Sequence, residues 1–421
     1  MRFGLGGPFS SVTRFFQDSN LIRTTNKFLK YAALSGVAVA SPAIALDPAS
    51  LLNYRMGPLQ LRPQLELKEV FDSNVYYRDT NIKADLITTI SPGVEVQLGQ
   101  LGGNFASIKY TFSRDVYLEN TALDADGHLV DFKMKYDTWK TSLTGVDRLQ
   151  LSSDVLNGGY GSISGTKVSR QTQFHEYSLQ YVYSPKTAVY LRGTANMAEF
   201  EKGTPLYNSN DMRAALGAQY FMFTRLAVFT EGYYGQTAVS PNTPTVDPAH
   251  STFYGGNVGV RGYIGTKTFG MIRAGYQTRS FADSTPGLAS PVVDVSLEHR
   301  FTERTKLGWS YSRKDYVSVQ FAREAYFSDL ISLKLDQNIG SSDKWKAYVS
   351  ASYEDLGYEL RPGQTSARND TSVRAGLGVT CQFTPWMSGS LGYEYENYAS
   401  NLSSVVDYQA NRITLRLAIG Y

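Results

Sequence analysis

The sequence is poor in several residues and patterns on which large classes of protein depend. Its 421 residues include one cysteine, Cys381, so no disulfide can form within the chain. We interpret Cys381 as a small apolar residue on a strand face, and it lies too far from the N-terminus to carry a lipid anchor. Beyond residue 45 no run of eighteen apolar residues occurs, which excludes a transmembrane helix in that part of the chain.

Residue patterns typical of enzymes and of metal or nucleotide sites are also missing. The four histidines, His128, His175, His250 and His299, include no His-x-Ser pair of the phospholipase kind. His299 shares a face with the apolar residues of its segment, where an interfacial position is enough to explain it. There is no metal-ligand spacing, glycine-rich phosphate loop or nucleophile elbow. We therefore expect no catalysis, no metal and no cofactor.

The first 45 residues have the features of an export signal. Lys27 and Lys30 precede an apolar run over residues 31–40, and Ala43-Ile-Ala45 supplies small residues at the positions that signal peptidase reads. The sequence thus predicts a signal peptide over residues 1–45, cleaved after Ala45, and a short periplasmic segment over residues 46–58.

The charge of the remaining chain argues against a nucleic-acid partner. The formal net charge is +3, but the first 45 residues hold five basic residues and one acidic residue. The predicted mature chain therefore carries a net charge of −1, which is not the basic surplus of a nucleic-acid-binding protein.

What the sequence does contain is strict alternation, and its C-terminus shows it best. In residues 411–421, Ile413, Leu415, Leu417, Ile419 and Tyr421 fall on one face of an extended strand, and polar or small residues fall on the other. This pattern resembles the closing strand of bacterial outer-membrane β-barrels, whose final aromatic residue is read by the barrel-insertion machinery. We interpret Tyr421 as that assembly signal and the insertion machinery as a partner.

Similar alternating runs recur along the chain from Leu59 onward. They begin near residues 62, 85, 104 and 127 and continue at 140–152, 173–183, 187–199, 211–223, 226–238, 253–264, 268–280, 292–301, 306–316, 327–338, 344–357, 372–383, 386–399 and 409–421. The count is about eighteen strands, with sixteen as the alternative. So many evenly spaced strands predict an all-β fold, a single transmembrane antiparallel barrel over residues 59–421.

The connections between the runs alternate in length. Tight turns are predicted at 184–187, 223–225, 265–268, 302–305, 340–344 and 384–385, where Gly, Pro, Ser and Thr supply turn conformations, and longer polar loops at 153–172, 201–210, 239–252, 281–291 and 359–371. Short periplasmic turns and longer external loops are typical of a barrel in the bacterial outer membrane. Both ends of the barrel are then expected on the periplasmic side.

Aromatic residues gather near the expected strand ends. Three of the four tryptophans, Trp139, Trp345 and Trp386, lie at or beside tight turns. Tyrosines near strand ends include Tyr183, Tyr190, Tyr233, Tyr234, Tyr311, Tyr393, Tyr395 and Tyr398. Since indole and phenol rings favour the lipid headgroup level, we expect these residues at the membrane interfaces, against outer-membrane lipid.

The polar face of each strand must line a lumen, and an eighteen-stranded barrel is too wide for side chains to fill. The candidate lumen residues carry charges of both signs. They are Arg62, Lys68, Lys109, Lys133, Lys135, Arg192, Arg213, Arg261, Arg273, Arg279, Arg374, Glu394, Glu396, Arg412 and Arg416. Two interpretations remain open: the charges pair across strands, or a surplus of bases gives the pore a preference for anionic solutes.

Three segments near the start of the predicted barrel resemble a known family. Asp72-Ser-Asn-Val-Tyr76, then Ile90-Ser-Pro-Gly-Val-Glu-Val96 and Tyr110-Thr-Phe112, are similar to the opening strands of the putative β-barrel porin 2 family. The resemblance implies a barrel in the outer membrane of a Gram-negative bacterium. Because several members accompany exopolysaccharide production and export, it also implies transport, with a polysaccharide or small solutes as partners.

The sequence leaves three classes of function to compare. The first is a conduit, porin-like or serving exopolysaccharide export; the second is a structural or assembly barrel without an open pore; the third, an enzyme, is the least favoured. Residues 153–172, with Asn157-Gly-Gly-Tyr-Gly-Ser162, are the longest candidate for a loop that folds inward as a constriction. The glycines are equally typical of a mobile external loop.

Overall fold

The structure is a computed structural model that describes residues 52–100, 103–242, 249–282, 287–320, 324–340, 344–359, 367–402 and 405–420. The predicted signal peptide (1–45) and Tyr421 lie outside the described residues, as does part of the predicted turn 340–344. Within the described ranges, no helix has both the length and the apolar character needed to cross a membrane.

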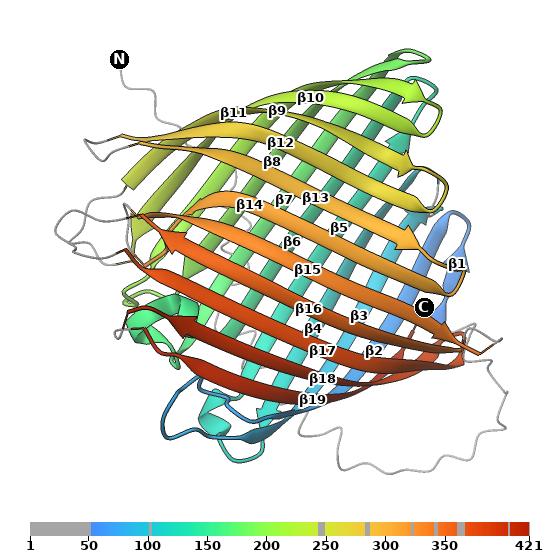
Figure 1. Cartoon of the computed structure of the whole chain (residues 1–421). Helices are drawn as coiled ribbons and strands as arrows, with labels where there is room; N and C mark the ends of the chain where they lie inside the picture. Colours follow the sequence, from blue (N-terminus) through green and yellow to red (C-terminus); the bar gives the residue numbers. More distant parts are fainter. Residues whose placement is uncertain are drawn as a thin grey trace, which may run out of the picture. The chain divides into compact units, whose positions relative to one another are not determined.

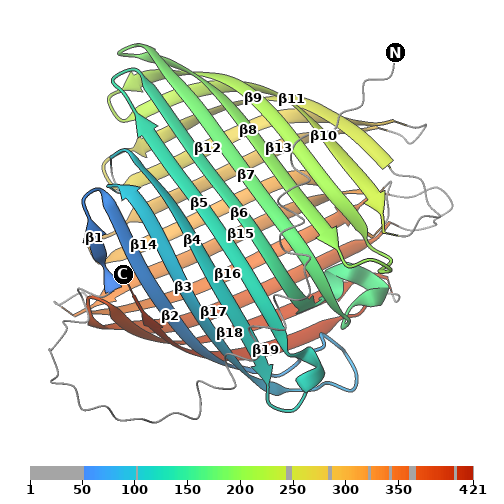
Figure 2. The same ribbon diagram turned by 180° about the vertical axis from the view of Figure 1, so that it is seen from behind.

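Nineteen strands and two short 3-10 helices make up the described secondary structure (Figures 1 and 2). The strands are β1 (Tyr54–Met56), β2 (Leu59–Asp72), β3 (Asp85–Gly99), β4 (Phe105–Tyr117), β5 (Ala125–Asp137), β6 (Thr141–Val155), β7 (Lys167–Ser184), β8 (Thr187–Phe200), β9 (Tyr207–Phe223), β10 (Leu226–Pro241), β11 (Ala249–Ile264), β12 (Thr268–Phe281), β13 (Leu288–Arg300), β14 (Thr305–Val317), β15 (Ala325–Ile339), β16 (Trp345–Tyr358), β17 (Asn369–Thr384), β18 (Met387–Ser400) and β19 (Tyr408–Ile419). The helices are η2 (Thr121–Leu123) and η3 (Gly158–Ile163).

The strands from β2 to β19 form one closed antiparallel barrel. Each pairs with its neighbour in the chain, and β19 pairs with β2, so that Arg412 stands opposite Asp72 and Ile419 opposite Leu65. The short strand β1 adds only a small hairpin to the start of β2. The predicted all-β barrel of eighteen strands is confirmed, and its first strand begins at Leu59.

Connections of two lengths separate the two ends of the barrel, as predicted. Tight turns lie at one end in Figure 1, for example Ser184–Thr187 and Thr384–Met387, and Gly265 adopts a φ of 78° in the turn before β12. The loops at the other end are shorter than the sequence indicated because the strands continue beyond the apolar alternation. β7 begins at Lys167, six residues before the predicted 173, and β13 begins at Leu288 instead of 292.

The two faces of the wall differ as the alternation requires. Residues that stand opposite each other in neighbouring strands share a face. One face carries exposed apolar residues such as Leu216 (66%), Val258 (64%) and Leu415 (58%), and the other carries buried polar residues such as Glu231 (2%) and Asp370 (0%). Exposed apolar side chains on a barrel face lipid, so the polar face lines the lumen.

Tyrosines on the outward face form a ring at the external end of the apolar band. Tyr234, Tyr254, Tyr276 and Tyr353 are 45–57% exposed, and polar residues follow them on the way to the loops. Trp139 (85%) and Trp345 (47%) lie beside the tight turns, as expected for the periplasmic interface. The prediction was wrong for three tyrosines, Tyr190, Tyr233 and Tyr398, which face inward and are at most 6% exposed. Each lies two residues from an inward-facing charge of its strand (Arg192, Glu231 and Glu396, respectively), and residues two apart in a strand share a face.

Candidate functional site: the lumen wall

The strand register places the predicted lumen residues on the inward face. Arg62 stands opposite Glu95, Lys109 opposite both Glu95 and Asp131, and Arg374 opposite Glu396. Lys68, Lys133, Lys135, Arg192, Arg213, Arg261, Arg273, Arg279, Glu394, Glu396, Arg412 and Arg416 share this face. These residues do not form one site; they fall into a wall of paired charges and a wall with a surplus of bases.

The paired wall includes the junction between β19 and β2, here called the seam. Arg412 contacts Asp72 at 2.7 Å, Glu396 at 2.8 Å and Glu394 at 3.0 Å. On the same strand Arg416 stands opposite Lys68 and lies 3.4 Å from Glu66. Arg62 lies outside the seam and stands opposite Glu95, because the seam pairs only residues 65–72 of β2. Both arginines of β19 therefore have an acidic partner at the seam, although Arg416 also stands opposite a base, Lys68.

The second wall has an arginine cluster, defined as Arg192, Arg213, Arg261 and Arg273 on β8, β9, β11 and β12. Its centre is the carboxylate of Glu231 on β10, whose side chain is 0% exposed. Three of the four guanidinium groups lie 2.8–3.7 Å from this carboxylate. Tyr190 and Asn257 also donate hydrogen bonds to it, at 3.2 and 3.3 Å.

Aromatic rings support the arginine cluster from behind. Arg213 lies 3.7 Å from the centroid of Tyr233, and Arg261 lies 5.6 Å from Tyr190 and 5.7 Å from Phe229. Such contacts hold a guanidinium by cation–π attraction without neutralising its charge. Among the described residues Arg261 has no ion pair. Glu231 pairs with the other three arginines, and Asp294 also pairs with Arg273 at 2.7 Å, so four guanidinium groups face two carboxylates. The cluster therefore keeps a net positive charge at the lumen surface.

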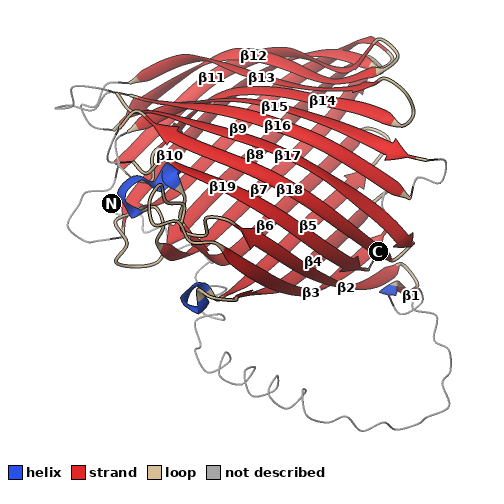
Figure 3. Ribbon diagram, turned by 60° about the horizontal axis from the view of Figure 1, so that its bottom comes forward, coloured by secondary structure: helices blue, strands red, loops and turns tan. Residues whose placement is uncertain are grey.

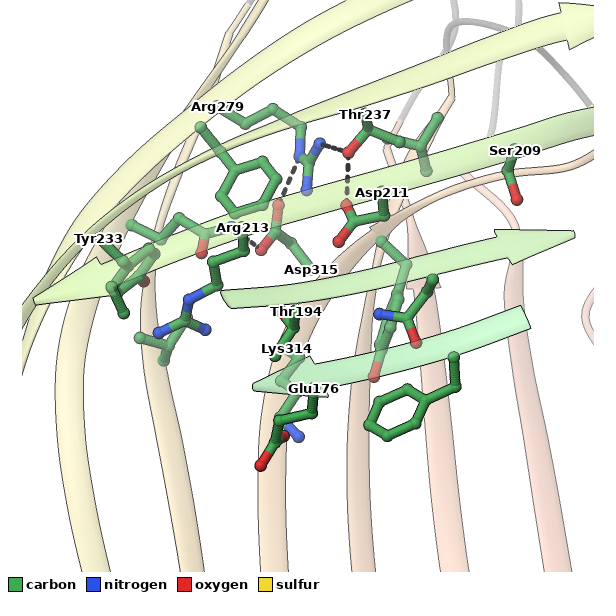
Figure 4. Close-up of a pocket in the computed structure, with 18 of the residues that line it drawn as sticks. Glu176, Thr194, Ser209, Asp211, Arg213, Tyr233, Thr237, Arg279, Lys314 and Asp315 are labelled. Carbon is green, nitrogen blue, oxygen red and sulfur yellow. Dashed lines mark hydrogen bonds and ion pairs between the residues drawn. The ribbon is translucent and has the colours of Figure 1, made fainter. Parts of the chain in front are cut away.

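A cavity of about 700 Å³ lies against this wall (Figure 4). Seven basic and four acidic side chains line it, so its surroundings are positive overall. The basic residues are Arg148, Arg192, Arg213, Arg273, Arg279, Arg313 and Lys314, and the acidic residues are Glu176, Asp211, Asp294 and Asp315. A low-dielectric barrel wall concentrates the field of such charges in an aqueous lumen.

The loop between β6 and β7 forms part of a cap at the external end (Figure 3, helices in blue). Leu156 of this loop and Val168 of β7 pack with Phe200, the last residue of β8, and with Leu206 of the β8–β9 loop; Val319 from the β14–β15 loop joins them. A backbone hydrogen bond of 2.8 Å from Tyr207 to Val319 ties β9 to that same loop. Elements that are far apart around the barrel thus meet in the cap, and the predicted inward loop belongs to it.

Gly158 shows how closely the cap contacts the opposite wall. A Cβ atom at this position would lie 2.4 Å from the ring of Tyr398 on β18. Tyr398 is 4% exposed, stacks on Tyr408 at 5.6 Å and donates a hydrogen bond to Asp370 at 2.5 Å, so its ring has no room to yield. Only glycine fits between η3 and β18.

We expect Gly158→Val to displace η3 from β18 and to widen the external mouth. The measurement is single-channel conductance in planar bilayers, together with protease cleavage of residues 156–166, and both should increase. Gly193→Val is the control, because a Cβ at Gly193 would meet no atom within 4 Å. Equal conductance and cleavage in all three proteins would show that the cap does not depend on this contact.

Sequence reasoning missed the partners that organise the arginine cluster. Glu231 belongs to an alternating strand with two neighbouring tyrosines, and no local signal marks it as the centre of three arginines. Asp315 was likewise seen only as one residue of a strand, although it contacts Arg279 at 2.7 Å. Their roles depend on which strands lie side by side and at which level, and this is a property of the closed barrel.

Comparison with known proteins gives a family match and several distant structural similarities. The family described as Putative beta-barrel porin 2 matches residues 47–421. No curated protein matches the sequence. The FrpB iron transporter from Neisseria meningitidis (F3-3 variant) is 11% identical with a TM-score of 0.46; the match covers 86% of this chain and 65% of that structure, less than two thirds of it.

Two structures from Pseudomonas aeruginosa are similar in extent. OpdK with vanillate is 10% identical, with a TM-score of 0.44 and coverage of 85% of this chain and 98% of that one. OccK2 (OpdF) in complex with glucuronate is 12% identical, with a TM-score of 0.44 and the same coverage of 85% and 98%.

Proposed function

Because the chain belongs to the Putative beta-barrel porin 2 family, we propose that it is a porin-like conduit for anionic solutes. Its place is the bacterial outer membrane, and its fold is that of a porin-like barrel. The observation that carries the proposal is the positive cavity wall, with seven basic and four acidic side chains. A wet lumen keeps these groups ionised, so their field acts on any solute that passes.

Acidic saccharides are the class of anion that we favour. Tyr316 is 43% exposed at the cavity and begins a stack with Tyr326 (5.6 Å) and Tyr358 (4.8 Å). An exposed tyrosine face beside basic side chains suits a sugar ring that carries a carboxylate, since the ring packs on the aromatic face and the carboxylate pairs with a base. The family resemblance to proteins of exopolysaccharide export supports the same choice.

The second candidate is a structural barrel that conducts no solute. The contacts of the cap across the external mouth favour this alternative, because Gly158 of η3 touches Tyr398 of β18. The two functions differ in a single measurable property, which is conductance through the purified protein.

The experiment is reversal potential in planar bilayers under a salt gradient. Wild type is expected to prefer anions, and the double variant Arg192→Gln, Arg261→Gln should shift the reversal potential toward cation preference. Arg192 and Arg261 are chosen because their loss leaves the Glu231 carboxylate paired. Arg213, at 2.8 Å, is closer to this carboxylate than Arg192, at 3.4 Å, and is unchanged in the variant.

The matched control removes two positive charges from the opposite side of the lumen, as Lys68→Gln, Arg416→Gln. If the arginine cluster sets selectivity, the control shifts the reversal potential much less than the test variant. Identical reversal potentials in wild type and the test variant would refute anion selection by the cluster. Absence of conductance in all three folded proteins would favour the structural barrel.

A further inference from the structure

The barrel wall is incomplete between β13 and β14. Their pairing extends only from Arg300–Lys306 to Val293–Arg313. Beyond that level β13 continues to pair with β12 as far as Leu288, and β14 continues to pair with β15 as far as Val317. Within the described part of the chain, residues 288–292 and 314–317 thus form two strand ends that face each other without a ladder. We call the space between them the slot.

Proline explains where the ladder ends. Pro291 lies in the unpaired part of β13, opposite Tyr276 of β12. It has no backbone N–H to donate, so a ladder that reaches it from β14 loses a hydrogen bond. β13 can keep its pairing with β12 on the other side, as the register shows. The slot is therefore encoded in the sequence.

The lumen cavity continues into the slot. On intact strands the lining residues largely alternate, as in Ser209, Asp211, Arg213 and Ala215 of β9. At the slot the lining residues are consecutive: 292–294 of β13 and 313–317 of β14. Consecutive residues of a strand point to opposite faces. Consecutive lining residues also occur at 172–174 of β7 and 196–198 of β8, but those strands are paired there with both neighbours, so at the slot this lining coincides with a missing ladder.

An ion pair crosses the slot on its lumen side (Figure 4). Asp315 of β14 accepts a hydrogen bond from Arg279 of β12 at 2.7 Å, and both side chains are at most 4% exposed. Arg279 also donates to Thr237 at 2.8 Å and Ser251 at 2.9 Å. The pair joins the two strands on either side of β13 and so holds the slot at a fixed width without a backbone ladder.

The outer rim of the slot lies at the level of the lipid headgroups. Tyr276 (56% exposed) and Tyr311 belong to the outward tyrosines that end the apolar band, and Val293 and Val295 lie on the periplasmic side of the slot. The next residues on β14 are Arg313 and Lys314, whose side chains are 32% and 46% exposed. Arg313 pairs with Asp329 at 2.6 Å and Lys314 lies 3.9 Å from Asp294. A molecule there meets an apolar wall toward the membrane centre and partly exposed, ion-paired bases at headgroup level.

From this arrangement we propose that the slot is a side entrance for an anionic amphiphile of the outer leaflet. Its phosphate or carboxylate headgroup passes Arg313 and Lys314 into the positive cavity, while its tail stays in the lipid along Val293 and along Ile272 of β12, which is 39% exposed. Charge complementarity selects this occupant, because seven basic and four acidic side chains line the cavity. The proposal is independent of axial conduction, since it requires only the slot and the cavity.

The test closes the slot without altering the bases. If the ladder continued, Ala289 would stand opposite Val317 at the register of the existing pairs. We would prepare the full-length protein with Cys381→Ser, Ala289→Cys and Val317→Cys, and measure dodecyl phosphate binding by calorimetry in neutral maltoside micelles. The reduced protein should bind dodecyl phosphate, and the oxidised protein should bind it about tenfold more weakly or not at all, since one lost charge-assisted hydrogen bond is enough for that change.

Each outcome decides for or against the side entrance. Where the disulfide does not form, a short bismaleimide linker closes the same pair of cysteines, and the same loss is expected. Equal affinity in the open and closed forms would overturn the proposal, as would inorganic phosphate binding as tightly as dodecyl phosphate, because the tail would then contribute nothing. Pro291→Thr should also weaken dodecyl phosphate binding, because it restores the ladder; slower amide exchange at residues 288–292 is the structural readout of that change. The control is Pro92→Thr on β3, where strand pairing resumes beyond the proline. This variant should leave binding unchanged.

Discussion

Replacing Glu231 with glutamine is expected to destabilise the folded barrel by roughly 3 kcal/mol, the lower end of the loss caused by breaking a buried ion pair. The side chain of Glu231 is 0% exposed, and Arg192, Arg213 and Arg273 lie within 3.7 Å of its carboxylate. A neutral amide would leave these guanidinium groups close together without an anion between them. The measurement is the temperature at which the protein loses its compact, faster-migrating form on gels.

The matched control for Glu231→Gln is Glu298→Gln. Glu298 also pairs with basic residues, Arg300 at 2.9 Å and Lys306 at 4.0 Å, but these side chains are 40–54% exposed. Exposed pairs contribute about 0–1 kcal/mol, so this variant should unfold close to the wild-type temperature. If both variants lowered the unfolding temperature by a similar amount, burial of the Glu231 ion pairs would contribute nothing to the stability of the barrel. In bilayers Glu231→Gln should also strengthen anion preference, opposite in sign to the loss of an arginine.

Replacing Arg412 with methionine is expected to reduce the yield of closed barrel sharply. Arg412 is 17% exposed and contacts Asp72, Glu394 and Glu396, so its loss leaves three carboxylates together at the seam. Glu396 keeps Arg374 at 3.0 Å, but Asp72, which is 7% exposed, loses the one base that pairs with it among the described residues, and an unpaired buried charge costs about 3–5 kcal/mol. The fraction of heat-modifiable protein in the outer membrane measures the effect.

Arg416→Met on the same strand is the control for Arg412→Met. Arg416 is 48% exposed and has one acidic contact, Glu66 at 3.4 Å, so the same substitution should change the folded fraction little. Equal folded fractions for the two variants would indicate that the seam depends on its backbone ladder alone.

The sequence predicts the barrel well because its two strongest signals are local. Alternation over a single strand, as in Ile413, Leu415 and Leu417, is enough to assign the outward face. Turn residues such as Gly265 are enough to separate the short connections from the long ones. Neither signal requires knowledge of a contact between distant segments.

The sites escaped prediction because they depend on distant contacts. Pro291 reads as the end of a polar loop, and only the register between β13 and β14 shows that it interrupts a wall. Gly158 reads as part of either a constriction or a mobile loop, and its contact with Tyr398, 240 residues later in the chain, has no local signal in the sequence. The tilt of the strands sets which inward residues reach the same level, and alternation contains no measure of tilt.

The order of strands also has a consequence for how the barrel forms. Seventeen of its eighteen ladders join strands that follow each other in the chain, and one joins β19 to β2. The first seventeen can therefore grow hairpin by hairpin, whereas the last must bring together Asp72 and Arg412, which are 340 residues apart. The entropy of closing a flexible loop of that length is about 5 kcal/mol, but a sheet already assembled and curved has lost most of that freedom. The rate of barrel closure should then depend on the pairing of β19 with β2, and loss of that pairing would leave a sheet with two unsatisfied edges.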